Sequence, residues 1–353
     1  MRGYPVWLML VGPPESGKTD LLKHLTVFNG VRECGDLSGK AGLLSATKAK
    51  EKAADATGGL LYSLPVYGGL HRGCLLMLDF ARTVLAAEPS ATRSTLGAIG
   101  MLHDQHWQRD VGTDGGRTLS FHGRIGFLAA CTDMIDHPDH QQANAEMGER
   151  CIFLRYPESD GYHEISRALE NPDSADKNTR MNDAFVQFRE ELGMDWDDAE
   201  EPRELTLEEK KMVVSLAQFT ARGRSGVQRD RYNRNEITGI NRSALGPRIA
   251  NSFAQLLRGM ERIGCTPEDR VAVLRQCTMD SLPSLRAVAV RLLQQYAGPV
   301  SLRTLAGAVK VSDGALKRAL EDLRMHGLVA LNTDALWHLS DVAQTLLAVG
   351  GLE

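Results

Sequence analysis

Several features are missing from this sequence, and each absence narrows the class of protein. None of its six cysteines forms a C-x-x-C pair, so we expect reduced core cysteines of an intracellular protein instead of a zinc site or disulfide framework. No apolar stretch reaches the roughly 18 residues that a membrane span requires. The chain also enters a strand-like run almost at once, without a signal peptide. We therefore expect a cytoplasmic protein with no membrane contact.

An excess of positive charge is absent as well. The chain of 353 residues contains 41 Lys and Arg against 45 Asp and Glu, which gives a net charge of −4. This balance argues against a uniformly basic nucleic-acid surface, so any contact with DNA must be local. The length is sufficient for two or three domains, each with its own core.

One segment near the amino end points to nucleotide binding. It spells G-x-x-x-x-G-K-T, follows the apolar run Val6–Val11 and precedes a helical pattern from Leu21. A strand, a glycine-rich loop and a helix in this order form a phosphate-binding loop, with the lysine on the β- and γ-phosphates and the following hydroxyl on Mg²⁺. We predict ATP and Mg²⁺ as ligands, bound by Gly12, Pro13, Pro14, Glu15, Ser16, Gly17, Lys18, Thr19 and Asp20.

A second apolar strand ends in a carboxylate. Leu75–Leu78 is followed by Asp79, which is the Walker B arrangement and predicts a second metal-site residue beside Thr19. The next residue is Phe80, where the usual Walker B motif continues with a glutamate that polarises the attacking water. A base from elsewhere is then required, and the alternatives are Glu33, Asp36 and Asp104. If none of these reaches the water, the protein would hydrolyse ATP slowly and act as a switch.

The pattern of elements predicts four regions. Short apolar runs alternate with helical patterns up to about residue 157, which predicts an α/β fold with a parallel sheet and helices on both faces. We expect a nucleotide-binding core over 1–165, an acidic linker over 166–205, an all-helical lid or connector over 206–297 and a terminal module over 298–346. The expected strands of the core are Val6–Val11, Val31–Cys34, Cys74–Phe80, Ile125–Cys131 and Cys151–Tyr156.

The terminal module has a distinctive order of elements. We predict a helix over Ser301–Val309, a turn over Lys310–Ser312 and a helix over Asp313–His326 with Ser312 as its N-cap. Two strands, Leu328–Leu331 and Ala335–Leu339, follow. This order resembles a winged helix-turn-helix, which implies DNA contacts by Lys317, Arg318 and Arg324. The alternative is a module for packing or protein contact, because Glu321 and Asp322 dilute the charge of the second helix.

A predicted hairpin precedes the fourth strand of the core. Trp107–Val111 and Arg117–Phe121 flank the glycine-rich turn Gly112–Gly116. A hairpin at this place resembles the pre-sensor-1 hairpin of the AAA+ clade that contains viral and MCM helicases and bacterial enhancer-binding activators. The resemblance implies that Arg109, Arg117 and also Arg124 face the nucleic-acid backbone, and that Thr132 is the sensor 1 residue. The alternative is an ordinary edge hairpin.

The same resemblance assigns roles to further arginines. Arg150, with Arg155 as its substitute, takes the place of the arginine finger that reaches a neighbouring subunit's nucleotide. Arg248, in the Gly246-Pro247-Arg248 sequence that opens a helix over Ile249–Ile263, takes the place of sensor 2. The alternative for each finger candidate is a salt-bridged surface arginine.

Together these patterns resemble an AAA+ P-loop ATPase of the pre-sensor-1 hairpin type with a C-terminal winged helix. The resemblance implies an ATP-dependent, DNA-associated motor, helicase-like and of the kind that phages and mobile elements use in replication. It also implies a homo-oligomeric ring and a replication partner protein. Two alternatives stay open: an ATP-switched winged-helix regulator, and a helicase loader or transposition-type ATPase.

Overall fold

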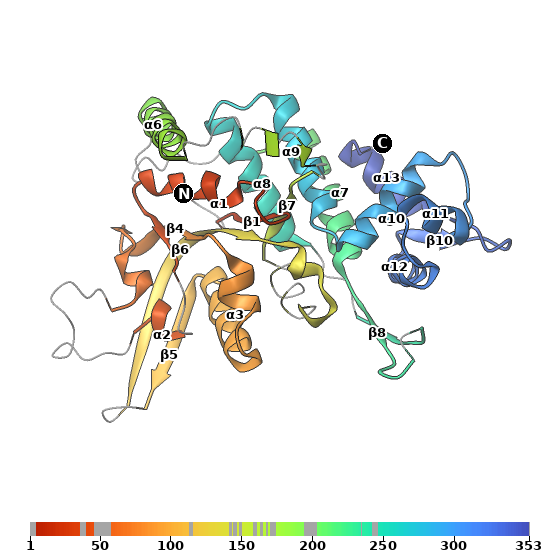
Figure 1. Cartoon of the computed structure of the whole chain (residues 1–353), viewed down its shortest axis with the longest axis horizontal. Helices are drawn as coiled ribbons and strands as arrows, with labels where there is room; N and C mark the ends of the chain where they lie inside the picture. The colour runs from red at the N-terminus through yellow and green to blue at the C-terminus, as the bar shows by residue number, and fades with distance from the viewer. Residues whose placement is uncertain are drawn as a thin grey trace. The chain divides into compact units, whose positions relative to one another are not determined.

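The chain divides into two compact units in the computed structural model (Figure 1). The first unit contains Met1–Arg150 and Arg155–Pro202, and the second contains Cys151–Leu154 and Arg203–Glu353. No described helix is both long and apolar enough to cross a bilayer. The structure describes residues 5–35, 40–45, 58–112, 116–140, 143, 147, 150–157, 161, 162, 165, 166, 169, 174–193, 203–233, 235–241 and 246–352.

Seven described strands form one sheet with the order β2-β4-β6-β1-β7, to which β3 adds beside β4 and β5 beside β6. All of them except Ile152–Leu154 of β7 belong to the first unit. The pairs β1–β6, β4–β6 and β2–β4 are parallel, so the predicted α/β fold with a parallel sheet is confirmed. The strands are β1 (Trp7–Val11), β2 (Val31–Glu33), β3 (Val66–Tyr67), β4 (Leu70–Met77), β5 (His106–Val111), β6 (Arg117–Cys131) and β7 (Ile152–Arg155).

Helices flank this sheet. In Figure 1 the orange helix α3 lies on one side of the sheet, and α1 and α6 lie on the other. The helices are α1 (Lys18–Lys23), α2 (Lys40–Leu43), α3 (Pro89–His103) and α6 (Ser174–Leu192), with short helical turns η1 (His24–Val27), η3 (Leu60–Ser63), η4 (Ala81–Leu85), η6 (Asp133–Asp136) and η7 (Pro138–His140).

Helix α6 lies within the stretch predicted as an acidic linker. Its Phe185 ring stacks on His24 with centroids 5.9 Å apart, and Phe188 meets Phe28 edge-on at 6.3 Å. Arg189 also donates a hydrogen bond to the Val27 carbonyl at 3.0 Å. Part of the acidic stretch is therefore a helix held against η1 by aromatic contacts.

Strand β6 corrects one expectation. The sequence predicts a hairpin strand over Arg117–Phe121 and a separate core strand over Ile125–Cys131, whereas the structure has one strand of 15 residues. Its first part pairs antiparallel with β5, and its later part pairs parallel with β4 and then β1. The strand runs on because Gly123 allows the close approach that a bulkier residue would prevent: a Cβ there would lie 2.8 Å from the His71 carbonyl oxygen.

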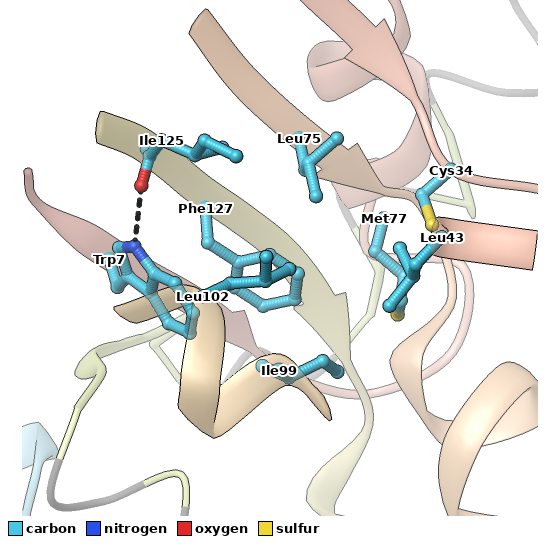
Figure 2. A pocket seen from close by; sticks show the side chains of 10 residues that line it. Trp7, Cys34, Leu43, Leu75, Met77, Ile99, Leu102, Ile125 and Phe127 are labelled. Carbon is cyan, nitrogen blue, oxygen red and sulfur yellow. Dashed lines mark hydrogen bonds between the residues drawn. The ribbon is translucent and has the colours of Figure 1, made fainter. Parts of the chain in front are cut away.

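The face of the sheet under α3 is closely packed with apolar side chains. Figure 2 shows Ile99 and Leu102 of α3 opposite Phe127 and other apolar side chains around a small pocket. Trp7 anchors this layer, because its indole N–H donates a buried hydrogen bond of 2.8 Å to the Ile125 carbonyl. An apolar layer with its one polar atom satisfied is a core, so it fixes the strands and offers no polar ligand site.

The second unit is mainly helical but contains a hairpin that the sequence did not predict. Val227–Arg229 and Ile237–Ile240 form the antiparallel pair β8–β9 with a register shift at Gln228 and Arg229, where the periodicity predicted helix throughout. Its elements are α7 (Leu207–Arg224), β8 (Val227–Arg229), β9 (Ile237–Ile240), α8 (Pro247–Arg262), α9 (Pro267–Asp280), α10 (Ser284–Gln295), α11 (Leu302–Val309), α12 (Asp313–Met325), β10 (Val329–Leu331), β11 (Trp337–Leu339) and α13 (Asp341–Gly350).

The terminal elements have the predicted order. Ser312 caps α12 by accepting a hydrogen bond from Ala315 N, and Gly327 follows the helix with φ of 73°. Strands β10 and β11 then pair antiparallel. One hydrophobic core joins these elements to Phe219 of α7 and to the apolar side of α10, so connector and terminal module fold around the same residues. The assignment of the terminal elements as a winged helix stays a prediction.

Helix α7 begins with a charged cap. Thr206 Oγ1 accepts from Glu209 N, and the Glu209 carboxylate accepts from Thr206 N. Arg203 donates two hydrogen bonds of 2.7 Å to the same carboxylate. These bonds, above all those from Arg203, lower the pKa of Glu209 from 4.5 to about 2.

This cap predicts a pH-dependent contribution to stability. Because the folded pKa is depressed, the stabilisation is fully present above pH 4.5 and is lost as the pH falls toward about 2. Glu209→Gln should lower the melting temperature at pH 7 by about 1–3 °C, since the pair is partly exposed. Melting curves should show that the difference from wild type shrinks below pH 4.5. Glu208→Gln removes the same charge one residue away and should have little effect; equal shifts for both variants would contradict the assignment.

Candidate functional site

The predicted phosphate loop joins β1 to α1. Gly12 N donates a hydrogen bond of 3.2 Å to the Cys131 carbonyl, which ties the start of the loop to the end of β6. Glu15 and Gly17 then have φ of 63° and 76°, and α1 begins at Lys18. Glycine adopts the left-handed conformation without steric cost, whereas Glu15 does so under strain. The Gly12–Thr19 loop therefore has the tight curvature that lets successive backbone N–H groups converge.

Lys18 is folded over this loop. Its ammonium donates to the Gly12 carbonyl at 2.9 Å, the Pro13 carbonyl at 2.6 Å and Ser16 Oγ at 2.8 Å, and the residue is only 7% exposed. Burial lowers the pKa of Lys18, while the negative charges of Asp133 and Asp79 oppose that shift. All three hydrogen-bond acceptors are neutral, so the site holds a cation whose charge is available to an anion.

Tyr156 forms a wall of the loop, and the sequence patterns did not identify it. Tyr156 N donates a 2.8 Å hydrogen bond to the Val11 carbonyl, and its ring centroid is 6.0 Å from Lys18 Nζ. A Cβ built on Gly12 would stand 2.9 Å from Tyr156 Cβ. The available signal was its position at the carboxyl end of the Cys151–Tyr156 run, because carboxyl ends of parallel strands meet at one edge of a sheet.

The two predicted metal residues lie at the same edge. Thr19 Oγ1 donates to the Leu78 carbonyl at 3.4 Å, and Asp79 follows Leu78. The exposed Asp79 carboxylate accepts a 2.9 Å hydrogen bond from Arg82 N. A hydroxyl and a carboxylate are hard oxygen donors of the kind Mg²⁺ prefers, and they fit this ion together with phosphate oxygens and water.

Two polar residues follow β6 at this edge of the sheet. Thr132 Oγ1 is buried and has no hydrogen-bond partner among the described residues. A buried hydroxyl without a partner is costly in a folded chain, which fits a ligand that would supply one. Asp133 is 63% exposed, and its charge is the foremost of those that act on Lys18.

Of the three carboxylates predicted as alternative catalytic bases, the two that the structure describes lie away from the phosphate loop. Asp104 directly follows α3, and the next residue, Gln105, binds Arg124 and Gly123 of β6. From Arg124 the strand runs about 23 Å further before it reaches Cys131, beside the phosphate loop. That distance excludes Asp104 from the loop. Glu33 ends β2, and two strands, β4 and β6, lie between it and β1. Asp36 lies outside the described residues.

The predicted finger arginines both contact their own unit. Arg155, 14% exposed at its side chain, binds Asp136 through two hydrogen bonds of 2.7 and 3.1 Å. The Arg150 guanidinium lies against α3, since a Cβ on Gly100 would meet it at 3.1 Å. Arg248 stands exposed in the first turn of α8, after Gly246 with φ of 83°, in the second unit. The finger and sensor 2 roles therefore stay predictions.

The predicted DNA contacts on the first hairpin have local partners instead. Arg109 donates to the Leu44 carbonyl, and Arg124 donates to Gln105 Oε1 at 3.1 Å. The hairpin itself is present, as β5 and the first part of β6, while the Arg117 side chain and residues 113–115 lie outside the described part of the chain. Of these three arginines, the two with described side chains both bind acceptors in their own unit.

On α12 the acidic side chains are held in ion pairs, whereas two of the basic side chains face solvent. Asp322 binds Arg286 at 2.7 Å and Arg229 at 2.5 Å, and Glu321 binds Arg229 at 3.1 Å. Lys317 and Arg324 are exposed, while Arg318 is half-buried and donates to Asn235 Oδ1 at 3.4 Å. The two acids therefore hold the β8–β9 hairpin and α10 on α12, and this pairing leaves less negative charge facing solvent.

The fold and the loop define the first unit as an α/β fold with a glycine-rich strand-to-helix loop at the carboxyl edge of a parallel sheet. No family model matches the chain, and no curated protein matches it either. Among solved structures it is similar to a proposed ATPase from Cytophaga hutchinsonii, with 12% sequence identity and a TM-score of 0.41, over 78% of this chain and 76% of that one. A likeness at this level carries no argument about function.

The close contact between Gly12 and Tyr156 predicts that any side chain at position 12 destabilises the fold. Gly12→Ala should lower the free energy of unfolding by about 1–3 kcal/mol, because Tyr156 Cβ must move away from the new methyl group. Denaturant unfolding measures this loss. Gly35→Ala, where a Cβ would meet nothing within 4 Å, should be close to neutral. Adding Tyr156→Gly to Gly12→Ala should recover part of the loss, and no recovery would contradict the proposed clash.

Proposed function

We propose that this chain binds Mg²⁺–ATP at the Gly12–Thr19 loop and hydrolyses it, as a DNA-associated ATPase of the AAA+ kind. The observation that carries the proposal is Lys18, a buried ammonium held over the loop by two backbone carbonyls and Ser16 Oγ. All three acceptors are neutral, and the negative charges of Asp133 and Asp79 only partly offset the burial that lowers the pKa of Lys18. A polyphosphate supplies the anionic partner that such a site favours.

In this proposal each residue at the carboxyl edge of the sheet has one task. Backbone N–H groups of the loop and the Lys18 ammonium bind phosphate oxygens and stabilise the charge that develops on them. Thr19 and Asp79 hold Mg²⁺, which neutralises phosphate charge when it is bound. Thr132 donates its otherwise unpartnered hydroxyl to the terminal phosphate or to the attacking water.

Asp133 is the carboxylate that we propose in place of the missing Walker B glutamate. Phe80, which follows Asp79, is fully buried and cannot polarise water. Asp133 follows Thr132 just after β6, the strand that lies directly beside β1, and its negative charge acts to raise the pKa of Lys18. Arg155 stands 3.8 Å from the Asp133 carboxylate and restrains its position. A base there receives the proton of the attacking water.

The finer part of the proposal concerns DNA. We propose a helicase-like replication motor that assembles as a ring, supported by the β5–β6 hairpin at the predicted place and by the helix-turn-helix order of α11 and α12. The Asp79-Phe80 sequence instead favours the ATP-switched regulator, because a weak base would make the bound state long-lived. ATP-driven strand displacement separates these two alternatives, since only the motor performs it.

Replacing the lysine tests nucleotide binding. Lys18→Ala should weaken ATP binding at least about tenfold, because a charge-assisted contact to phosphate is lost. Isothermal titration calorimetry with Mg²⁺–ATP measures the affinity. Lys23→Ala is the matched control, since Lys23 lies on the same helix but binds Asp20 at 2.8 Å. Equal affinities of wild type and Lys18→Ala, or no binding by the wild type at millimolar ATP, would refute the proposal.

Replacing the proposed base tests hydrolysis separately from binding. Asp133→Asn should lower kcat about a hundredfold or more while ATP affinity changes little, because the amide cannot take the proton. Steady-state phosphate release and calorimetry give the two quantities. Asp139→Asn, in the nearby turn η7 with a side chain 83% exposed, is the control. Unchanged turnover in Asp133→Asn with a loss in Glu33→Gln would assign the base to β2 instead.

A further inference from the structure

The β8–β9 hairpin presents an aromatic side chain to solvent at an ordered turn. Tyr232 is 93% exposed, the largest value among the exposed large apolar side chains of the described residues. The turn that carries it is fixed, because Asp230 Oδ1 accepts hydrogen bonds from Tyr232 N at 2.8 Å and Asn233 N at 2.6 Å. Asp230 N also donates to the Glu236 carbonyl at 3.0 Å. The backbone at Tyr232 is therefore restrained, while its side chain is exposed to solvent.

The base of this hairpin is attached to α12. Arg229 donates to Glu321 and Asp322, and also to the Arg318 carbonyl at 3.1 Å. Nearer the tip, Asn235 Oδ1 accepts from Arg318 at 3.4 Å. Arg286 completes the network, with a bond to Asp322 at 2.7 Å and bonds to two carbonyls at the end of α7. The hairpin and the middle of α12 therefore form one continuous surface.

The charges of this surface are unequally exposed. Glu321 and Asp322 are engaged by Arg229 and Arg286, and their side chains are only 19% and 16% exposed. Arg231, Lys317 and Arg324 are exposed, although Lys317 stands 3.8 Å from Glu321. Asp230 and Glu236 contribute negative charge near the turn, and Asp230 is engaged by backbone N–H groups. The solvent-exposed charges around the Tyr232 ring are therefore more positive than negative.

We propose that the β8–β9 hairpin and the adjoining face of α12 bind single-stranded nucleic acid, with Tyr232 stacked on an unpaired base and Arg231 and Lys317 on phosphates. A basic surface with an exposed aromatic ring matches the two recognition elements of such a strand. Bases in a duplex are already stacked on their neighbours, so an exposed ring favours an unpaired base. The inference rests on the proposed function for its biological context, while its contacts belong to the second unit alone.

The experiment uses the full chain without nucleotide, and measures fluorescence anisotropy of a labelled oligothymidylate. Wild type should bind, Tyr232→Ala should bind about tenfold or more weakly, and Tyr232→Phe should stay within about twofold of wild type. Tyr296→Ala, at a tyrosine that is 36% exposed after α10, is the matched control and should bind as wild type does. Arg231→Ala should reduce the slope of the logarithm of the binding constant against the logarithm of salt concentration by about one. Melting temperatures should be unchanged for Tyr232→Ala.

Specific results would overturn the inference. These are an oligothymidylate affinity that Tyr232→Ala leaves unchanged, an equal loss in Tyr232→Phe, or an equal loss for a duplex probe. A Tyr232→Ala variant that alters self-association but not oligothymidylate affinity would assign the surface to protein contact and also overturn it. ATP binding is measured separately by calorimetry, so failure of the proposed ATPase and failure of this surface give different patterns.

Discussion

The parallel pairing of β1 with β6 is the constraint on which the candidate site depends. Val11 lies opposite Cys131, so the Gly12–Thr19 loop begins where Thr132 and Asp133 follow the neighbouring strand. A slip of one residue would turn every side chain of β6 to the other face of the sheet. The buried hydrogen bond from Trp7 to the Ile125 carbonyl and the apolar layer under α3 oppose that slip.

Local signals made part of this structure predictable. The loop sequence, the apolar runs of the strands and the N-cap Ser312 each act within a few residues, and the structure has β1, β2, β7 and α12 close to their predicted positions. Strand β4 overlaps its predicted range but begins four residues earlier and ends three residues earlier. The order of Gly12, Lys18 and Thr19 also predicts a phosphate site, because the chemistry of such a loop depends on residue type at close spacing, and that assignment stays a prediction.

Long-range contacts explain what the sequence could not show. The periodicity did not reveal the β8–β9 hairpin, because its position depends on Arg229 binding acids about ninety residues further along the chain. The sequence left open whether Arg155 is a finger or a salt-bridged arginine, because position in a strand does not fix the direction of a guanidinium. In the structure it pairs with Asp136. Tyr156 belongs to the loop only because two strands end side by side, which is a property of the sheet and not of any one segment.

The unbroken course of β6 has a consequence for the candidate site. The 15 residues of this strand span about 50 Å, and its hydrogen-bonded neighbours fix its register along that length. One continuous strand therefore joins the β5–β6 hairpin to the residue that precedes Thr132, beside the start of the Gly12–Thr19 loop.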